Sequence, residues 1–358
     1  MAGTGVIFDI TPEQEASKLQ FLRRQFSGAP PAVSRDDVDL SGQAAIVTGA
    51  NGGIGLECCR QLLDLGVSKL ILAVRDERKG EAARGTLMAA RSSSRAISQT
   101  LEVWKLDYAS YESVVAFARR AEGLQQQQPR LGVAVLNAGV NRGSFALNPE
   151  TGHEEDVQTN YLSTVLLTLL LLRTFKQSSS AASPAQGPGR IVIVSSDTAA
   201  WAKFAEKDQD PLLPALDDEA RFNVYDRYAT TKLLGQLFVT ELARRVPAAT
   251  AIVSLANPGL CHGSSLNREL GLAAVLFMRL MGRTAAVGAR SLVSAAVGQD
   301  ARSHGQYIED CVIRPMAPFV YSDDAKVVSQ RLWKETMDEL SFAGVDKIIE
   351  EISQAERT

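Results

Sequence analysis

The sequence predicts a single α/β domain, a doubly wound parallel β-sheet with helices on both faces, preceded by an N-terminal extension. Three observations indicate this fold class. From residue 43 onward, strand-length aliphatic and β-branched segments alternate with helical ones. The first of these segments enters a glycine-rich turn that opens a helix. Polar residues directly follow several of the others, as expected where parallel strands end at one ligand-binding edge.

The composition is that of a globular protein and narrows the function classes. The chain has 358 residues, of which 45% are hydrophobic and 22% are charged. Its formal net charge of −3 argues against a nucleic-acid-binding protein, which needs a basic surplus. Cys58 and Cys59 are adjacent, no C-x-x-C pair occurs, and the three histidines lie far apart. We therefore expect no metal site and no disulfide framework, but reduced thiols in an intracellular, cytoplasmic protein.

Residues 1–40 are predicted to form the extension. Residues 1–10 lack the basic start and apolar stretch of a secretory signal. Thr11 and Pro12 indicate a helix start, as N-cap and first helical residue. An apolar stripe at i, i+3 and i+7 follows, formed by Leu19, Leu22 and Phe26. We expect this helix to pack on the main domain, and nothing in it suggests chemistry.

The main domain is predicted to span residues 41–358. Its predicted strands are residues 43–47, 69–74, 101–106, 132–136, 190–194 and 250–255. Helices are expected at residues 55–65 and at 161–172, the most apolar run. That run is shorter than the roughly 20 residues of a transmembrane helix, so a buried helix is predicted and no membrane span. Low-complexity segments predict surface loops at 91–99, 125–128 and 177–189.

The glycine-rich turn predicts a phosphate-binding site. It reads Thr48-Gly49-Ala50-Asn51-Gly52-Gly53-Ile54-Gly55, between the first strand and the helix after it. Glycines allow the backbone to turn tightly and to approach a pyrophosphate. The helix start supplies free N–H groups and the positive end of the helix dipole. The strand–turn–helix context therefore indicates a dinucleotide.

The end of the second strand bears on which dinucleotide binds. Arg75 stands first after the strand, with Arg78 and Lys79 close behind. Arginine pairs with a 2′-phosphate, whereas an acid such as Asp76 accepts from a free 2′-hydroxyl. The cations favour NADP over NAD, and Asp76 is the counter-evidence.

Tyr228 and Lys232 form the candidate catalytic pair, because residues at i and i+4 share one face of a helix. A free phenol has a pKa near 10, which is too high for ready proton exchange at neutral pH. A nearby ammonium stabilises phenolate, so Lys232 is expected to lower the pKa of Tyr228. Three strands end in polar motifs expected to converge on the same edge: Asn137-Ala138-Gly139, Ser195-Ser196-Asp197 and Asn257-Pro258-Gly259.

Taken together, these motifs and Asn160 resemble the classical short-chain dehydrogenase/reductase family, over about residues 40–340. Within it, the chain looks most like the retinol-dehydrogenase-like branch and related natural-product pathway reductases of secondary metabolite biosynthesis. The resemblance implies a Rossmann fold. It also implies that Tyr228 is the general acid or base, assisted by Lys232, that Ser196 orients the substrate oxygen, and that Asn160 anchors a water leading protons to Lys232.

The same resemblance implies a set of cofactor-binding residues. They are Gly49, Asn51, Gly53, Ile54, Gly55, Arg75, Asp107, Asn137, Ala138, Gly139, Tyr228, Lys232, Pro258 and Gly259. Asp107 is expected at the adenine, Asn137 near the cofactor ribose, and Pro258 at the nicotinamide. No metal is implied.

The chain departs from the family pattern at several places. Thr231 replaces the usual serine before the lysine but retains a hydroxyl, and Asn257 replaces a histidine common in the retinol-dehydrogenase-like branch. Residues 203–221 lengthen the segment between Ser196 and Tyr228 and are expected to shape the cleft mouth. Gly49, Gly52 and Gly55 also fit the spacing of the extended branch, which includes epimerases.

Residues 260–282 correspond to the family's substrate lid, here called the lid segment. Their apolar character suggests a lipophilic small-molecule substrate. Packing on the core, or peripheral contact with a membrane surface, would explain the same composition.

We therefore predict an NADP(H)-dependent oxidoreductase. It would transfer a hydride between nicotinamide and a carbonyl, or a primary or secondary alcohol, of a lipophilic small molecule. A non-catalytic NADP(H)-binding regulator, or an epimerase or dehydratase on the same fold, remains an alternative. Homo-oligomers are common in the family, although the extension could block the usual contacts.

Overall fold

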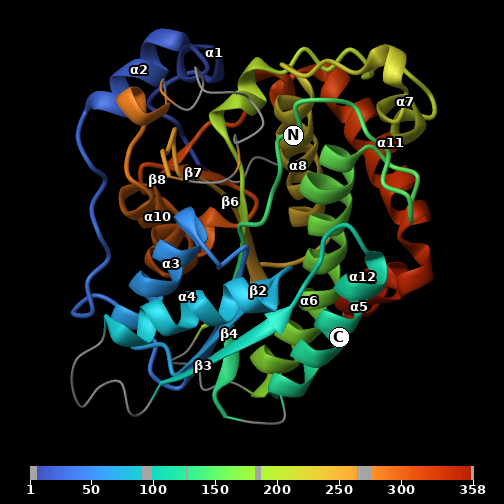
Figure 1. Ribbon diagram of the computed structural model, residues 1–358. Helices are drawn as coiled ribbons and strands as arrows, with labels where there is room; N and C mark the ends of the chain where they lie inside the picture. Colours follow the sequence, from blue (N-terminus) through green and yellow to red (C-terminus); the bar gives the residue numbers. More distant parts are fainter. Residues whose placement is uncertain are drawn as a thin grey trace.

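The computed structural model describes residues 6–90, 99–125, 128–181, 187–263, 266, 276 and 278–355 (Figure 1). Its strands are β1 (Gln43–Thr48), β2 (Lys69–Val74), β3 (Thr100–Lys105), β4 (Arg130–Leu136), β5 (Gly189–Val194), β6 (Ala251–Asn257), β7 (Tyr307–Glu309) and β8 (Val312–Arg314). They form one sheet in the order β3-β2-β1-β4-β5-β6-β7-β8. All neighbouring pairs are parallel except β7 and β8. The predicted doubly wound fold is confirmed.

The six predicted strands are all present, with ends shifted by at most two residues, but β7 and β8 were not predicted. Each has only three residues, too few for a periodic signal. Their hairpin is closed by Asp310 and Cys311, which both adopt positive φ angles of 50° and 66°. Neither residue is a glycine, so the sequence gives little indication of this turn.

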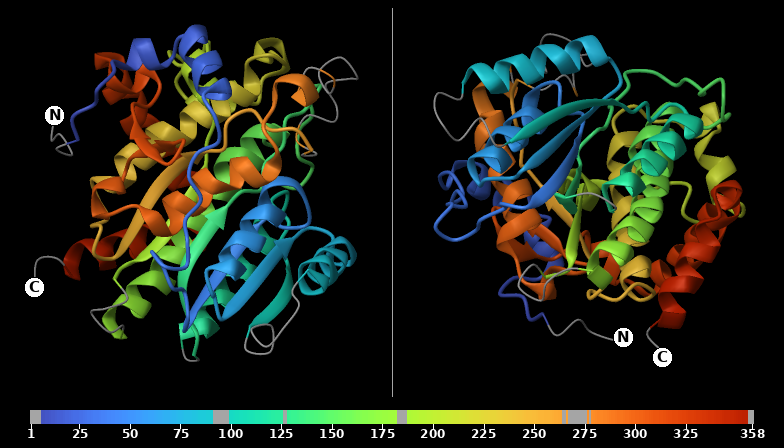
Figure 2. Two further views of the ribbon diagram at one scale, coloured as in Figure 1. Left: turned by 90° about the vertical axis from the view of Figure 1, so that its left-hand side faces the viewer. Right: turned by 90° about the horizontal axis from the view of Figure 1, so that it is seen from below.

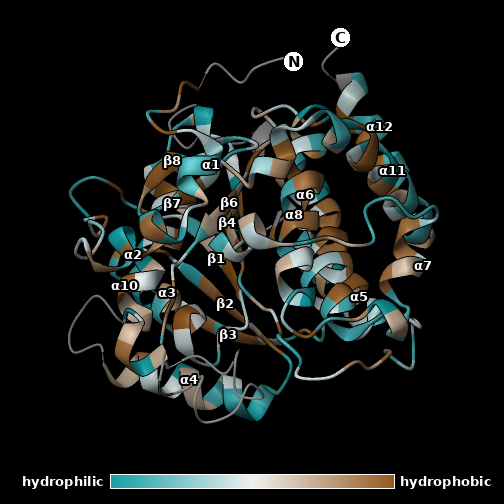
Figure 3. Cartoon of the chain, turned by 90° about the horizontal axis from the view of Figure 1, so that it is seen from above, coloured by the Kyte–Doolittle hydropathy of each residue, from teal (hydrophilic) through white to brown (hydrophobic). Residues whose placement is uncertain are grey.

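The helices are α1 (Pro12–Glu15), α2 (Lys18–Phe26), α3 (Gly53–Asp64), α4 (Glu77–Ala89), α5 (Tyr111–Glu122), α6 (Ser163–Ala181), α7 (Leu212–Leu216), α8 (Arg227–Ala243), α10 (Ala285–Val293), α11 (Asp323–Glu339) and α12 (Val345–Ala355). One face of the sheet is covered by α3, α4 and α10, and the other by α5, α6, α8, α11 and α12 (Figures 1 and 3). Apolar residues on α6 and α8 are prominent in Figure 3, and each face has its own buried core.

The predicted buried helix at 161–172 lies within a longer helical segment. A π-helical turn at Val157–Leu162 leads directly into α6, which continues to Ala181. The predicted loop 177–189 is therefore wrong in its first five residues, because serine and alanine there extend the helix. Most of the predicted loops 91–99 and 125–128 lies outside the described residues.

The extension forms two short helices where one was expected. Thr11 caps α1 through a capping box with Gln14, and Pro12 is its first residue, as predicted. The chain then breaks at Ser17, whose Oγ accepts from the Gln20 amide at 3.1 Å and caps α2. The following segment runs past α10 toward β1 (Figure 2). It is held to α10 by Arg290, whose Nη1 donates to the Pro30 carbonyl at 2.9 Å.

The predicted apolar stripe is not what attaches α2 to the domain. Leu19 is 78% exposed and Phe26 is 59% exposed, whereas Arg24 and Gln25 are buried. Helix α2 packs on the main domain, as expected, but through polar side chains, because carboxylate and carbonyl acceptors on the main domain bind Arg24 and Gln25.

Among the described residues, the helices are all too short or too polar to span a lipid bilayer.

The core beneath the sheet predicts a contrast between two apolar residues of α11. Leu332→Ala is expected to lower the free energy of unfolding by about 2–5 kcal/mol, because this fully buried side chain leaves a cavity. Val327→Ala, on the same helix at 66% exposure, is expected to change it by about 0.5 kcal/mol or less. Urea denaturation followed by circular dichroism measures both, and equal losses would contradict the assigned core.

Candidate active site

A cleft of about 960 Å³ opens at the carboxyl ends of β1, β2, β4, β5 and β6. We call it the active-site cleft. The predicted site residues that line it are Gly49, Asn51, Gly53, Ile54, Arg75, Asp107, Asn137, Ala138, Gly139, Ser196, Tyr228, Lys232, Pro258 and Gly259. Gly55 and Asn160 lie behind this lining, in contact with residues that form it. One connected space thus joins the glycine-rich turn to the Tyr228 region.

The turn after β1 has the geometry that a bound phosphate requires. Gly49 and Gly53 adopt positive φ angles of 65° and 54°, which favour glycine. A Cβ on Gly55 would lie 2.5 Å from the Gly49 carbonyl oxygen, so no side chain fits there. Helix α3 begins at Gly53 without a side-chain cap, which leaves its first N–H groups for an anion.

Thr48 and Asn137 join the ends of β1 and β4. The Ala138 amide donates to Thr48 Oγ1 at 2.9 Å, and Asn137 Nδ2 donates to the Thr48 carbonyl at 3.0 Å. The order of the sheet reverses between these two strands, which is where open parallel sheets bind ligands. These bonds hold the floor of the cleft, so Asn137 shapes the site through its bond to the Thr48 backbone on the neighbouring strand.

Arg75, Asp76 and Lys79 line the far end of the cleft, beyond β2. Asp76 is the N-cap of α4, and its Oδ1 accepts from the amides of Arg78 and Lys79 at 3.0 and 3.3 Å. These backbone bonds lower the pKa of the Asp76 carboxyl. Asp76, which counted against a bound 2′-phosphate, therefore serves as the N-cap of α4. Arg75 and Lys79 line the cleft beside it.

Tyr228 and Lys232 meet Ser196 at the near end of the cleft. Lys232 Nζ lies 5.5 Å from the centre of the Tyr228 ring and donates to the Val194 carbonyl at 2.9 Å. Ser196 lies two residues after the end of β5 and caps the short 3₁₀-helix Asp197–Trp201, accepting from the Thr198 amide at 3.2 Å. The Ser196 side chain lowers the pKa of Tyr228, against the larger effect of burial. The neighbouring Ser195 is buried too, and its Oγ has no hydrogen-bond partner among the described residues.

The expected lowering of the Tyr228 pKa by Lys232 was wrong. Burial raises the pKa of the phenol above its usual value, and the carboxyls of Asp197 and Asp156 raise it further. Burial also lowers the pKa of Lys232 to about 8, against the opposing effect of Asp156. Desolvation penalises both charged forms, and it is the largest contribution to each shift.

Asn160 connects the cleft wall to helix α8. Its side chain exchanges two hydrogen bonds with the backbone of Val140, each 2.8 Å long. Its Nδ2 also lies 3.2 Å from Thr231 Oγ1, which in turn donates to the Tyr228 carbonyl at 2.7 Å. The threonine that replaces serine thus keeps a hydroxyl contact to the Tyr228 helix. Asn160 lies within the π-helical turn, which positions its side chain toward α8.

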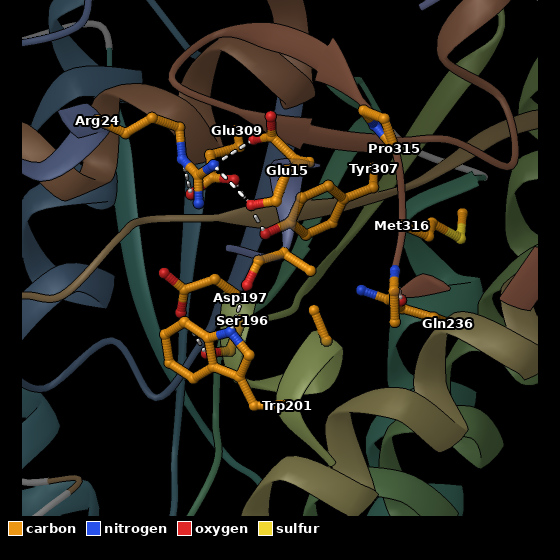
Figure 4. Close-up of a pocket in the computed structure, with 13 residues that line it drawn as sticks. Glu15, Arg24, Ser196, Asp197, Trp201, Gln236, Tyr307, Glu309, Pro315 and Met316 are labelled. Atoms are coloured by element: carbon orange, nitrogen blue, oxygen red, sulfur yellow. Dashed lines mark hydrogen bonds and ion pairs between the residues drawn. The ribbon is translucent and has the colours of Figure 1, made fainter. Parts of the chain in front are cut away.

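Asn257, in place of the histidine, connects β6 to a buried ionic network. Its Nδ2 donates to Glu309 Oε1 at 2.8 Å, and its Oδ1 accepts from the Gly259 amide at 3.0 Å. Arg24 of α2 pairs with the same Glu309 oxygen at 3.2 Å and with Glu15. Figure 4 shows Arg24, Glu15 and Glu309 on one side of a small pocket, facing Asp197, Ser196 and Trp201.

The extension contributes to the lining of the cleft, although nothing in its sequence suggested a place at the site. Lys18, Phe21 and Leu22 of α2 line the cleft, together with Trp201. No sequence motif signals this, because residues 18–22 are distant from every other lining residue along the chain. The helical spacing of residues 18, 21 and 22 was the one available indication of a shared face.

Residues 203–221 do not shape the cleft mouth, contrary to expectation. None of them lines the cleft. Instead, α7 lies beside α11 (Figure 1), where the amides of Leu212 and Leu213 donate to the Glu335 carboxylate at 2.9 and 2.8 Å. Residues 264–265, 267–275 and 277 of the lid segment lie outside the described residues. Of its described part, Leu260, Leu266 and Met278 line the cleft.

In the part of the chain that the structure describes, no group of three or more histidine, cysteine or acidic residues could hold a metal ion. All four cysteines are described, and none forms a disulfide.

The buried ammonium predicts a pH-dependent stability difference for Lys232→Met in the cofactor-free protein. The pKa of Lys232 falls from 10.5 to about 8 on folding, so the native state bears the full cost of the charge below about pH 8. The variant is expected to gain up to about 3 kcal/mol of unfolding free energy at pH 7, and the gain should vanish above about pH 10.5. Urea titrations at several pH values measure the difference.

The matched control is Lys326→Met, which removes an exposed lysine from α11 and should not change stability in this way. A gain for Lys232→Met that is absent at pH 7, or that is independent of pH, would contradict the assigned burial.

Comparisons with known proteins identify the family of this chain. A family model described as short chain dehydrogenase matches residues 43–205. Short-chain dehydrogenase fogG of Aspergillus ruber is 47% identical to this chain, over 98% of the chain and 99% of its own length. Short chain dehydrogenase/reductase mfmJ of Annulohypoxylon moriforme is 40% identical, over 92% and 94%.

Solved structures show the same fold. The crystal structure of an uncharacterized protein from Mycobacterium paratuberculosis superimposes with a TM-score of 0.61 at 27% identity, covering 87% of this chain and 98% of its own. A Shigella flexneri short chain dehydrogenase complexed with NADP gives a TM-score of 0.52 at 20% identity, over 76% and 98%, which speaks for the fold alone. The identity and coverage of the curated relatives establish that this chain belongs to the short-chain dehydrogenase/reductase family of oxidoreductases.

Proposed function

We propose that this protein is an NADP(H)-dependent oxidoreductase that interconverts a carbonyl and an alcohol on a lipophilic small molecule. One observation carries the proposal. Ser196, Tyr228 and Lys232 line one cleft together with the glycine-rich turn after β1. A proton donor and a dinucleotide cradle thus share one space, as hydride transfer with proton transfer requires.

The residues of the cleft fit a nicotinamide dinucleotide. The cleft volume of about 960 Å³ lies at the upper end of the roughly 300–1,000 Å³ of ligand pockets. The Gly49–Gly55 turn and the uncapped α3 start would hold the pyrophosphate, and Asp107 would lie at the adenine end. Pro258 and Gly259 would border the nicotinamide. The bound dinucleotide would supply or accept the hydride.

The side chains of the cleft supply the rest of the reaction. Ser196 Oγ would donate to the substrate oxygen and hold it beside the Tyr228 hydroxyl. In reduction, Tyr228 gives its proton to that oxygen as the hydride reaches the carbon, so the product is a neutral alcohol. The raised pKa of Tyr228 keeps the phenol protonated and ready to donate. Lys232, whose pKa is about 8, can return a proton to the phenolate near neutral pH.

Asn160 would support this proton return. Its side chain is fully engaged with Val140 and Thr231, which fixes the π-helical turn against the Lys232 helix. A Cβ on Gly139 would lie 3.1 Å from Asn160 Oδ1 and 3.8 Å from Lys232 Nζ, so these three residues meet at one place. We propose that a water held there connects Lys232 to solvent.

NADP is the preferred form in this proposal. Arg75 and Lys79 line the end of the cleft where the adenosine ribose would lie, and Asp76 is engaged as the helix cap. Guanidinium and ammonium groups there would pair with a 2′-phosphate. The lipophilic substrate follows from the near end of the cleft, which is lined by Phe21, Leu22, Leu260, Leu266 and Met278.

Tyr228→Phe is expected to lower kcat for carbonyl reduction by at least about 10²–10⁴-fold, because the proton donor is lost. NADPH affinity should be unchanged, since the ring remains. Stopped-flow absorbance of the reduced nicotinamide measures turnover, and fluorescence titration measures binding. Tyr225→Phe is the matched control, because Tyr225 is 93% exposed and outside the cleft. Undiminished turnover of Tyr228→Phe would refute the assignment.

Arg75→Ala is expected to weaken NADPH binding roughly 10- to 100-fold, since a charge-assisted pair contributes about 1.5–3 kcal/mol. NADH binding should be unaffected, because NADH has no 2′-phosphate. Arg84→Ala, on α4 but outside the cleft, should alter neither affinity. Equal losses for both cofactors in Arg75→Ala, or a wild-type preference for NADH, would contradict the proposed specificity.

A further inference from the structure

We propose that helix α2 of the extension forms the substrate-selecting wall of the active-site cleft, and that Phe21 and Leu22 bind the aromatic part of an aryl carbonyl substrate. The inference rests on the proposed function and names the substrate class of the same site. It starts from the observation that Phe21 and Leu22 line the same cleft as Ser196 and Tyr228.

One face of α2 is turned toward the cleft. Lys18, Phe21 and Leu22 line the cleft, and Gln25 is buried one turn further, so the positions i, i+3, i+4 and i+7 lie on the domain side. Leu19 lies outside this face and is 78% exposed. The rotation of the helix about its axis therefore determines which apolar side chains enter the cleft. Phe21 and Leu22 line it, whereas the equally apolar Leu19 is exposed.

Buried polar contacts fix that rotation. Arg24 pairs with Glu309 of β7 at 3.2 Å and with Glu15 of α1, and all three side chains are buried. Removing one partner of such a cluster would leave a buried charge unpaired, so the arrangement has little freedom. The Arg24 carbonyl also accepts from Arg283, which is ion-paired with Asp310 in the turn after β7. The wall is thus attached to the edge of the sheet.

Gln25 attaches α2 to both sides of the lid segment. Its Nε2 donates to the Leu260 carbonyl and to the Met281 carbonyl, each at 2.9 Å. The described lid residues Leu260 and Met278 line the cleft, as do Phe21 and Leu22. An apolar substrate group at the near end would therefore meet the lid segment and α2 together.

Trp201 connects the same wall to the Ser196 segment. Its Nε1 donates to the Ala16 carbonyl at 2.8 Å, Phe21 meets it edge-on with 5.4 Å between ring centres, and Lys18 Nζ lies 3.0 Å from its ring centre. Trp201 ends the 3₁₀-helix that Ser196 caps. The substrate oxygen at Ser196 and a ring against Phe21 would thus be recognised by two directly connected elements.

This combination favours an aromatic substrate. Phe21 and Trp201 offer ring surfaces at the near end of the cleft, and ring pairs gain about 0.5–1.5 kcal/mol beyond the burial of area. A small aliphatic ketone would reach Ser196 and Tyr228 but would leave this wall uncovered. The expected signature is discrimination by the size of the substrate, with chemistry at the carbonyl unchanged.

The test compares Phe21→Ala, Leu22→Ala and the double variant with Leu19→Ala as the matched control on the same helix. The substrates are 2-acetylnaphthalene and butanone, each with saturating NADPH. We expect kcat/KM for 2-acetylnaphthalene to fall roughly 10- to 100-fold in the double variant, through KM, and to stay unchanged for butanone. Leu19→Ala should match the wild type on both. Thermal unfolding and NADPH affinity serve to show that the fold and cofactor site are intact.

Equilibrium binding of 2-acetylnaphthalene in the presence of NADP⁺, measured by calorimetry, separates this inference from the proposed function. If the wild type reduces neither ketone, the proposed function fails on its own, and binding still tests the wall. Weaker binding in the double variant, with Leu19→Ala unchanged, supports it. The inference would be overturned by equal losses for both ketones, or by an effect of Leu19→Ala of the same size. It would also be overturned if the wild type bound 2-acetylnaphthalene no more tightly than butanone.

Discussion

The parallel pairing of β1, β4, β5 and β6 is the constraint on which the rest of this structure depends. Parallel register brings the carboxyl ends of these strands to one edge, so residues more than 200 positions apart, from Gly49 to Gly259, face one cleft. The reversal of strand order between β1 and β4 opens the sheet there, and Thr48 and Asn137 hold the two ends together. Every group assigned to chemistry sits on or beside this edge.

Desolvation determines the electrostatics at that edge. Burial raises the pKa of Tyr228 and lowers that of Lys232 to about 8, and it raises the pKa of nearby Asp156 to about 8 with the help of Glu154. The neutral forms of the phenol and the carboxyl are thereby favoured over their charged forms. The Tyr228 phenol therefore stays protonated at neutral pH, and charge brought in with a ligand would change that balance.

The buried ionic network extends the site beyond the parallel sheet. Glu309 accepts from Asn257, which holds the Gly259 amide at the cleft, and it pairs with Arg24 of the extension. Asparagine at position 257 provides both a donor and an acceptor for this arrangement. The short β7–β8 hairpin, which completes the sheet, thus serves as the attachment point for α2.

Local sequence determined the elements whose signal lies in adjacent residues. The strand–turn–helix around Gly49–Gly55, the spacing of Tyr228 and Lys232, and the polar residues after β4, β5 and β6 were all readable, because backbone conformation and helical periodicity act over a few residues. These features were sufficient for the fold class and for the predicted residues that line the cleft at the ends of the strands. They also placed Thr11 and Pro12 at the start of α1.

Only the tertiary structure decided how α2 is oriented, which residues of the extension enter the cleft, and how burial shifts the Tyr228 and Lys232 pKa values. The apolar stripe of α2 gave no indication of its buried polar contacts, because the main-domain acceptors that bind Arg24 and Gln25 lie more than 200 residues away, on Glu309 and on both sides of the lid segment. Likewise, the spacing of Tyr228 and Lys232 predicts that their charges attract each other. It does not show how far each side chain is removed from water on folding. Desolvation is a property of the assembled surroundings, and no stretch of sequence specifies it alone.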